Sequence, residues 1–265
     1  MNSSHFAPNP AGHAIVVTRV AEQEWQAVAD DRVVGRGDAA HRFDGRLFIS
    51  VDAWHEAAFD RLAAAMLADL PAPLHTVVDE TDLALTSHWE RSGFRTLRRE
   101  REYLVPTDPA ITGLSSVRPP AGITIVPAGE AQEGPLRALD RTIRDEIDAT
   151  VGWQTMPAEV LPRPAGSTVV DPSRYVVAAQ SGAYVGLLRV APVPRRQRIG
   201  LIAVRADRRR RGIARAMLAQ ALLSLHDAGE GTARAEVDVS NGPAEALFEG
   251  VGAQRAGGNL ELVRD

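Results

Sequence analysis

Residues 201–218 read LIAVRADRRRRGIARAML, and this stretch decides the fold of the C-terminal half. The apolar run ending at Val204 is typical of a buried strand, the arginine-rich segment of a loop, and the apolar stripe from Gly212 to Leu225 of a helix. The first N–H groups of a helix lack partners within it and favour an anion. Gly212 lets a phosphate approach the backbone, and Ala214 keeps that surface low. The sequence therefore predicts a diphosphate site, with arginines to offset the charge.

This junction resembles motif A of the GNAT superfamily of acyltransferases, in which Gln/Arg-x-x-Gly-x-Gly/Ala follows a bulged strand. The resemblance implies that the loop holds the pyrophosphate of the cosubstrate acetyl-CoA, and that free backbone groups of the strand bind its pantetheine arm. It also implies that the N–H of Val204 polarises the thioester carbonyl, which is an oxyanion-type role. The residues with these expected cofactor roles are Ile202, Ala203, Val204, Arg209, Arg210, Arg211, Gly212, Ile213 and Ala214.

A second match lies at residues 241–253, NGPAEALFEGVGA, which resemble the family's motif B, Asn-x-x-Ala-x-x-Leu-Tyr-x-x-x-Gly-Phe. The resemblance implies that Asn241 contacts the pantetheine region and that Phe248 lies beside the thioester sulfur. The family often has a tyrosine there to protonate the leaving thiolate, and phenylalanine cannot donate a proton. Either another group or solvent protonates the thiolate, or the step needs no acid, because a thiol pKa of about 8.5 makes the thiolate a fair leaving group.

Transfer to an amine also needs a base that removes a proton from the acceptor. Glu236 and Asp238 lie on the strand after the helix and share one of its faces by the two-residue period. A further helix is expected at 135–148. Glu146, near its end, is the third candidate base, and Asp145 beside it is expected to contact the acceptor. Each acid can equally be an ordinary surface charge, and a helix over the strand face would make Glu236 or Asp238 a buried, paired carboxylate instead.

The acceptor side is expected in the loop at 149–164, where Trp153 either lines the pocket or anchors two helices in the core. The expected reaction is acetyl transfer to a primary amine of a small molecule or peptide, by direct attack in a ternary complex. No covalent enzyme intermediate is needed, which fits the absence of cysteine. The rival function is a catalytically inactive acyl-CoA-binding sensor or interaction module. Phe248 and the lack of an acid on the strand at 199–204 favour that rival.

The N-terminal half repeats much of the same order of elements, which indicates an internal duplication. Its residues 85–94, LTSHWERSGF, resemble motif B. Its loop at 49–56, ISVDAWHE, has no glycine and carries acids that would repel a phosphate, so we interpret this half as a degenerate copy. The proline-rich segment between the halves is expected to be a linker. The predicted division is 1–106 for the degenerate domain, 107–121 for the linker and 122–265 for the acetyltransferase domain.

The predicted fold is α/β (α+β), with two GNAT-like domains in tandem, each a mixed, mostly antiparallel sheet flanked by helices. This organisation is similar to that of tandem GNAT enzymes with one degenerate half, such as mycothiol synthase. The similarity is architectural and assigns no substrate.

Composition excludes several classes of function. The chain has 265 residues and a net charge of -4. It has no cysteine, so disulfides, thiolate metal sites and a cysteine nucleophile are excluded. No secretory signal or membrane-spanning stretch is found, so we expect a cytoplasmic protein without a membrane partner. The scattered histidines predict no metal. The arginine run at 208–211 lacks interleaved aromatics, which disfavours a nucleic-acid partner. Gly212 and Ala214 favour the pyrophosphate site over a plain solvated loop. The oligomeric state stays open, with a homodimer as one option.

Overall fold

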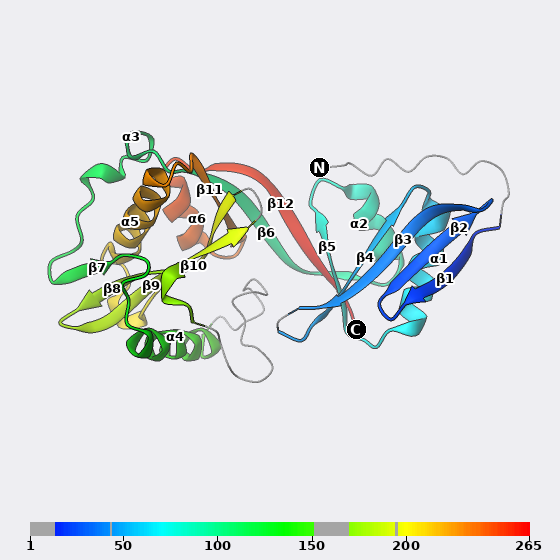
Figure 1. Ribbon diagram of the computed structural model, residues 1–265, viewed down its shortest axis with the longest axis horizontal. Coiled ribbons are helices and arrows are strands. Elements are labelled where there is room, and N and C mark those ends of the chain that lie inside the picture. The colour runs from blue at the N-terminus through cyan, green and yellow to red at the C-terminus, as the bar shows by residue number, and fades with distance from the viewer. Residues whose placement is uncertain (1–13, 43, 151–169, 194–195) are drawn as a thin grey trace. The chain divides into compact units, whose positions relative to one another are not determined.

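The computed structural model describes residues 14–42, 44–150, 170–193 and 196–265 (Figure 1). These residues form two compact units. Unit 1 contains the described residues up to Arg99 together with Gly257–Asp265, and unit 2 contains those from Glu100 to Ala256. The predicted fold class is confirmed, because each unit has a mixed, mostly antiparallel sheet with helices packed on it.

Both units are built from strands and helices. Those that begin in unit 1 are β1 (Val16–Ala21), β2 (Glu24–Ala29), β3 (Arg32–His41), β4 (Leu47–Ala53), α1 (Glu56–Asp69), β5 (Leu74–Asp79), α2 (Leu83–Arg91) and β6 (Arg95–Pro106). Those that begin in unit 2 are α3 (Pro109–Thr112), η1 (Leu114–Ser116), β7 (Ile123–Val126), α4 (Glu133–Asp148), η4 (Pro172–Arg174), β8 (Tyr175–Gln180), β9 (Ala183–Val193), β10 (Arg196–Val204), η5 (Ala206–Arg208), α5 (Ile213–Asp227), β11 (Thr232–Asp238), α6 (Gly242–Glu249) and β12 (Gln254–Arg264).

Strands β6 and β12 each begin in one unit and end in the other. The second half of β6, Glu100–Pro106, pairs antiparallel with β11 in unit 2. The second half of β12, Asn259–Arg264, pairs antiparallel with β5 in unit 1. The compact units therefore divide at residue 99 and exchange their closing strands, whereas the sequence-based division at 106 assigns each closing strand to its own half.

Unit 1 has one apolar core, which lies between its sheet and both of its helices. Buried residues of α1, among them Phe59, Leu62 and Met66, share this core with Trp89 of α2. The tight turn between β2 and β3 places Asp30 and Asp31 at positive φ, as a two-residue hairpin turn of this kind requires. In the part of the chain that the structure describes, no helix of unit 1 packs on the opposite face of this sheet.

Unit 2 has helices on both faces of its sheet, and alternate strand residues belong to different cores. Tyr175, Val177 and Leu187 pack with α4, whereas the intervening Val176 and Leu188 pack with α5. Figure 1 shows α4 and α5 on either side of strands β8 and β9. Helix α5 is positioned by its apolar stripe, in which Met217, Leu218, Ala221 and Leu222 are almost fully buried.

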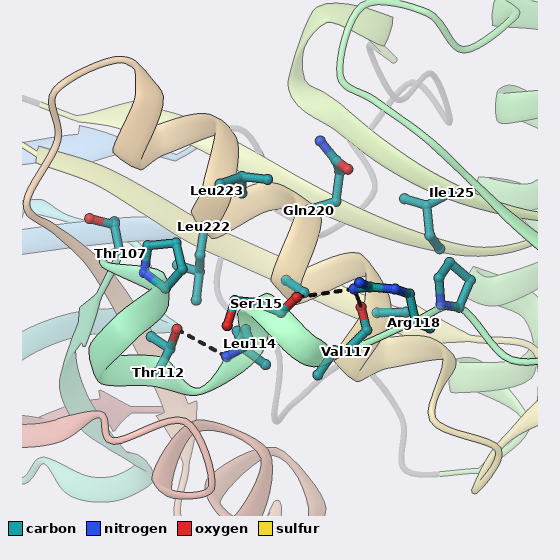
Figure 2. Close-up of a pocket in the computed structure, with 14 residues that line it drawn as sticks. Thr107, Thr112, Leu114, Ser115, Val117, Arg118, Ile125, Gln220, Leu222 and Leu223 are labelled. Atoms are coloured by element: carbon teal, nitrogen blue, oxygen red, sulfur yellow. Dashed lines mark hydrogen bonds between the residues drawn. The ribbon is translucent and has the colours of Figure 1, made fainter.

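The predicted linker is not an extended connection. Its residues form α3 and η1, and Leu114 is buried in the core of unit 2. A cavity of about 280 Å³ lies between this segment and α5, and its lining includes Thr107, Leu222 and Gln220 (Figure 2). Figure 2 also shows Arg118 bonded to carbonyl oxygens of its own segment. None of the residues predicted for the cofactor site lines this cavity.

Candidate functional site

The site is built on the end of β10, where this strand separates from β11. The two strands pair in parallel over Arg198–Ile199 and Arg234–Ala235, and among the described residues this pairing goes no further. A register shift against β9 makes Gly200 an extra, bulged residue. From Leu201 onward, β10 stays paired with β9 on one side only. The expected bulged strand is present, and its other edge faces the space left by β11.

The orientation of the backbone groups on β10 follows from the antiparallel ladder. The N–H of Arg205 donates to the carbonyl of Val185 at 2.9 Å. Because hydrogen-bonded pairs alternate along such a ladder, Ala203 bonds to β9, whereas the N–H and C=O groups of Ile202 and Val204 point away from it. Ile202 can therefore offer both backbone groups to a ligand and Val204 its N–H, because the Val204 carbonyl accepts from Arg209 and Ala203 belongs to the ladder.

The arginine-rich loop leads into α5 through a glycine with a left-handed backbone. Gly212 is the N-cap residue of α5 with φ of 82°, and no side chain caps this helix end. The first turn carries no acid. A Cβ atom built on Gly212 would have Pro120 Cγ, 3.8 Å away, as its nearest neighbour. The helix N-terminus thus offers N–H groups with open space in front of them, as binding of a diphosphate requires.

The two residues after Gly212 differ in role. Ile213 is 2% exposed and anchors the start of α5 in the core. Ala214 is partly buried and packs against the same core, so it leaves only a low surface near the helix end. The geometry therefore assigns packing to Ile213 and close approach to Gly212 and Ala214.

The three candidate arginines of the loop have different partners. Arg209 donates from Nε to the carbonyl of Val204 at 3.1 Å, which fixes it beside the end of β10. Arg211 donates to the carbonyl of Asp207 at 3.2 Å. Arg210 is exposed at φ of 63°, and within the described part of the chain it makes no hydrogen bond or ion pair. All three guanidinium groups can therefore offset the charge of a phosphate at this loop.

Glu146 connects α4 to this loop. Its Oε2 accepts a hydrogen bond from the N–H of Ala206 at 2.8 Å, and its carboxylate lies 3.5 Å from Arg205 Nε and 3.6 Å from Arg209 Nη2. Asp145, one residue earlier, is exposed and has no ion pair among the described residues. The expected acceptor contact at Trp153 lies outside the described residues.

The two candidate bases on β11 already have partners. Glu236 Oε2 accepts a hydrogen bond from Arg198 Nη1 at 2.8 Å. Asp238 accepts from the N–H of Ser240 at 2.9 Å and from its hydroxyl at 2.5 Å, which closes the turn after the strand. Both carboxylates are half-buried on the face opposite Ala235 and Val237, which pack in the core with α5. Their face is thus the one that the core with α5 does not cover.

The residues of the second motif mainly support α6. Asn241 is its N-cap, and its side chain accepts from the N–H of Ala244 at 3.2 Å. Phe248 is 4% exposed and stacks on Tyr103, with ring centroids 6.1 Å apart. Among the described residues, the geometry shows Asn241 as a cap and Phe248 as a core side chain.

The hydroxyl of Tyr103, whose ring stacks on Phe248, is a functional group that the sequence did not predict for this site. It donates to Glu249 at 3.3 Å. Burial, followed by the charges of Glu245 and Glu249, raises its pKa above the usual value. The signal was hidden because Tyr103 lies on β6, which the sequence assigned to the N-terminal half, whereas it pairs with Ala235 in unit 2.

Two further classes of site are absent from the described residues. No helix there is both long and apolar enough to cross a membrane. No group of three or more histidine, aspartate or glutamate side chains there is arranged to hold a metal ion. A second cavity, of about 350 Å³, lies beside the arginine loop and is lined by Tyr184, Arg205 and Arg208 among others.

Sequence comparison finds one match to a known family, within unit 2. Residues 142–253 match the model of the acetyltransferase (GNAT) family. This range contains β10, the arginine loop, α5, β11 and α6. No curated protein matches the chain.

Structural comparison extends the likeness to both units. The GCN5-related N-acetyltransferase from Sphaerobacter thermophilus matches with a TM-score of 0.61 and 17% identity, over 93% of this chain and 82% of the other. A tandem GNAT protein from the clavulanic acid biosynthesis pathway also matches with a TM-score of 0.61 and 17% identity, over 98% and 85%. The GCN5-related N-acetyltransferase from Kribbella flavida matches with a TM-score of 0.59 and 15% identity, over 95% and 89%. At these identities the likeness concerns the fold.

Proposed function

Because residues 142–253 match the model of the acetyltransferase (GNAT) family, we propose that this chain transfers an acetyl group from acetyl-CoA to a primary amine of a small molecule or peptide. One observation carries the proposal. Strand β10 directs the backbone groups of Ile202 and the N–H of Val204 away from β9, and the same strand leads into an open, glycine-capped helix end flanked by arginines. These residues fit the two polar parts of the cofactor, the amide-bearing pantetheine arm and the pyrophosphate.

Acetyl-CoA supplies an activated acetyl thioester when it is bound. The backbone of Gly212 and Ala214 and the guanidinium groups of Arg209, Arg210 and Arg211 would hold its diphosphate. The N–H of Val204 would stabilise the charge that develops on the thioester oxygen. The amine nitrogen forms the new bond to the acetyl carbon, the carbon–sulfur bond breaks, and the thiolate of CoA leaves. Positioning of the amine would supply much of the rate.

The proton of the attacking amine needs an acceptor, and Glu236 and Asp238 are the candidates on the open face of β11. Glu236 is tied to Arg198, so it would act after this pair opens or through a water molecule. Asp238 is tied to Ser240. Asp145 and Trp153 remain proposed acceptor contacts.

A second candidate function is an acyl-CoA-binding module without turnover. It is favoured by the burial of Phe248, which has no hydroxyl, and by the fact that both acids of β11 already have partners. Turnover is the observation that separates it from the transferase.

The first test is calorimetric titration with acetyl-CoA of the wild type and of Gly212→Glu. The added carboxylate enters the anion site, and binding should weaken by more than about 100-fold. Gly229→Glu is the matched control, because Gly229 also has positive φ, of 85°, and follows the other end of α5 with nothing within 4 Å of an added Cβ. Both variants bear the same backbone strain. Equal binding by Gly212→Glu and wild type would rule out the site.

The second test measures release of the CoA thiol with panels of amines, peptides and aminoglycosides. Release that depends on an amine, with acetylated product, would support the transferase. Binding without release across all panels would favour the binding module.

A further inference from the structure

The last turn of α4 is electrostatically unusual. Asp145, Glu146 and Asp148 lie at the C-terminal end of the helix, and no basic residue shares this turn. The negative end of the helix dipole makes acids unfavourable there. Asp145 and Asp148 are exposed to solvent, whereas Glu146 is directed at the arginine loop, with a side chain that is 20% exposed. The unfavourable placement of Glu146 is therefore offset by its partners on another element.

Those partners are the parts of the loop that the proposed cofactor site uses. The N–H of Ala206 donates to Glu146 at 2.8 Å, which fixes the first turn after β10. Arg209 Nη2 lies 3.6 Å from the same carboxylate, while Arg209 Nε bonds to the carbonyl of Val204. Arg209 is thus held at both ends of its guanidinium group, by Glu146 and by the strand whose N–H would polarise the thioester.

We propose that Glu146 is a positioning residue that holds the arginine loop in its anion-binding form, and that it is not the catalytic base. The Glu146 carboxylate already accepts the N–H of Ala206 and faces Arg205 and Arg209, so its contacts tie it to the loop. The inference rests on the proposed function for its link to acetyl-CoA. It goes beyond that function because it joins the loop to α4, the helix that leads directly into residues 149–164 on the expected acceptor side.

For the affinity of a Glu146 variant for acetyl-CoA, a positioning role and simple charge repulsion predict opposite changes. Removing a negative charge near an anion site should tighten the binding of an anion. If Glu146 positions the loop, Glu146→Ala should instead weaken acetyl-CoA binding by about tenfold, because Arg209 and the Ala206 N–H lose a charge-assisted partner. Glu146→Gln keeps an acceptor for the N–H and should recover most of the affinity. Asp148→Ala is the control, because it removes an equal charge from the same turn without a contact to the loop.

The experiment combines amide hydrogen exchange on the free proteins, calorimetry with acetyl-CoA, and kcat and KM from thiol release. Faster exchange over 205–212 in Glu146→Ala alone, higher Kd and KM, and a kcat within about threefold of wild type would support positioning. A fall of kcat by about 100-fold or more in both variants, with unchanged Kd and loss of the acidic limb of the pH profile, would make Glu146 the base and overturn the inference. Unchanged exchange would also overturn it. Absence of acetyl-CoA binding by the wild type would instead refute the proposed function, and exchange would still report on the loop.

Discussion

Both units contain a strand that separates from its parallel neighbour and leads into a helix, but the loop between strand and helix differs. We call this strand the crossing strand, β4 in unit 1 and β10 in unit 2. In unit 1, β4 pairs with β5 in parallel only at Leu47–Phe48 and stays paired with β3 along its length, just as β10 separates from β11 but not from β9. Two residues, 54 and 55, join β4 to α1, whereas eight residues, 205–212, join β10 to α5. The separated strands are therefore common to both units, and the connection to the helix is longer and arginine-rich in unit 2.

Equivalent glycines show how closely the scaffolds agree. A Cβ on Gly35 would meet Leu62 of α1, Ala53 and the carbonyl of Asp52. A Cβ on Gly186 would meet Met217 of α5, Val204 and the carbonyl of Ala203. In both units a glycine on the neighbouring strand lets the helix approach the end of the crossing strand.

The start of the helix is where the units diverge. Helix α1 begins with Glu56, which accepts from Arg91 at 2.7 Å, so an internal carboxylate occupies its first turn. Helix α5 begins after Gly212 with no acid in its first turn. A carboxylate at a helix N-terminus competes with any external anion. In unit 1, the crossing strand therefore leads into a helix whose first turn already holds a carboxylate where a diphosphate would bind.

The largest expected difference between the units is the effect of charge reversal on acetyl-CoA affinity. Arg209→Glu removes the contact to Val204 and repels a phosphate, so acetyl-CoA affinity should fall by about 100-fold or more. Arg91→Glu makes the same change in unit 1 and should leave affinity unchanged. Calorimetry of both variants measures this, and a comparable loss in Arg91→Glu would mean that unit 1 also contributes to binding.

The second prediction concerns the sheet face of unit 1 that lacks a helix, where unit 2 has α4. There Glu261 is buried beside His75, at 3.1 Å, and beside Arg46 and Arg98. Burial alone would raise the pKa of Glu261, but the hydrogen bond from His75 and the two arginine charges outweigh it and lower the pKa below its usual 4.5. Folding therefore favours the ionised form.

The sign of the pH dependence follows from that lowered pKa. The stabilisation is present above the unfolded pKa of Glu261 and is lost as pH falls through the lower folded pKa. Glu261→Gln should cost about 2 kcal/mol of stability at pH 7, and its difference from wild type should shrink below about pH 4.5. Denaturant unfolding at pH 7 and at lower pH measures this. A difference that stays constant with pH would show that Glu261 contributes by packing alone.

The equivalent glycines give the third prediction. An alanine Cβ at position 35 would lie 2.8 Å from Leu62 Cδ1, 3.1 Å from Ala53 Cβ and 3.2 Å from a backbone oxygen, so Gly35→Ala should cost about 2 kcal/mol. At position 186 the nearest atom is the flexible end of Met217, at 3.0 Å, and the cost should be about 1 kcal/mol. Hydrogen exchange within each unit measures the two effects separately. The reverse order would mean that α5 packs less adaptably than α1.

The smallest effect is expected at Phe248. Phe248→Tyr restores the hydroxyl that the family often has, but this side chain is buried and stacked on Tyr103. If CoA leaves as a thiolate without an acid, kcat should change by less than about threefold. A rise of tenfold or more, measured by thiol release, would show that protonation of the leaving group limits turnover.

Local sequence predicted the parts of the molecule that local forces determine. The apolar stripe placed α5 within two residues of its observed ends, 213 and 227, and the loop with Gly212 was located correctly. The exchange of β6 and β12 could not be read from the sequence, because strand pairing depends on distant partners. For the same reason Tyr103 was assigned to the wrong half. The roles of Ile202 and Ala203 differ because of the ladder register, which only the partner strand fixes.

The exchanged strands make the two halves dependent on each other as parts of one folding unit. A cut at residue 106 would take Glu100–Pro106 away from β11 and would leave Asn259–Arg264 without β5. A gene fragment encoding either half alone would therefore encode a sheet with a missing strand and an orphaned one. The sheet of unit 2 therefore depends on a strand that the N-terminal half of the chain supplies, and the sheet of unit 1 depends on the last strand of the C-terminal half.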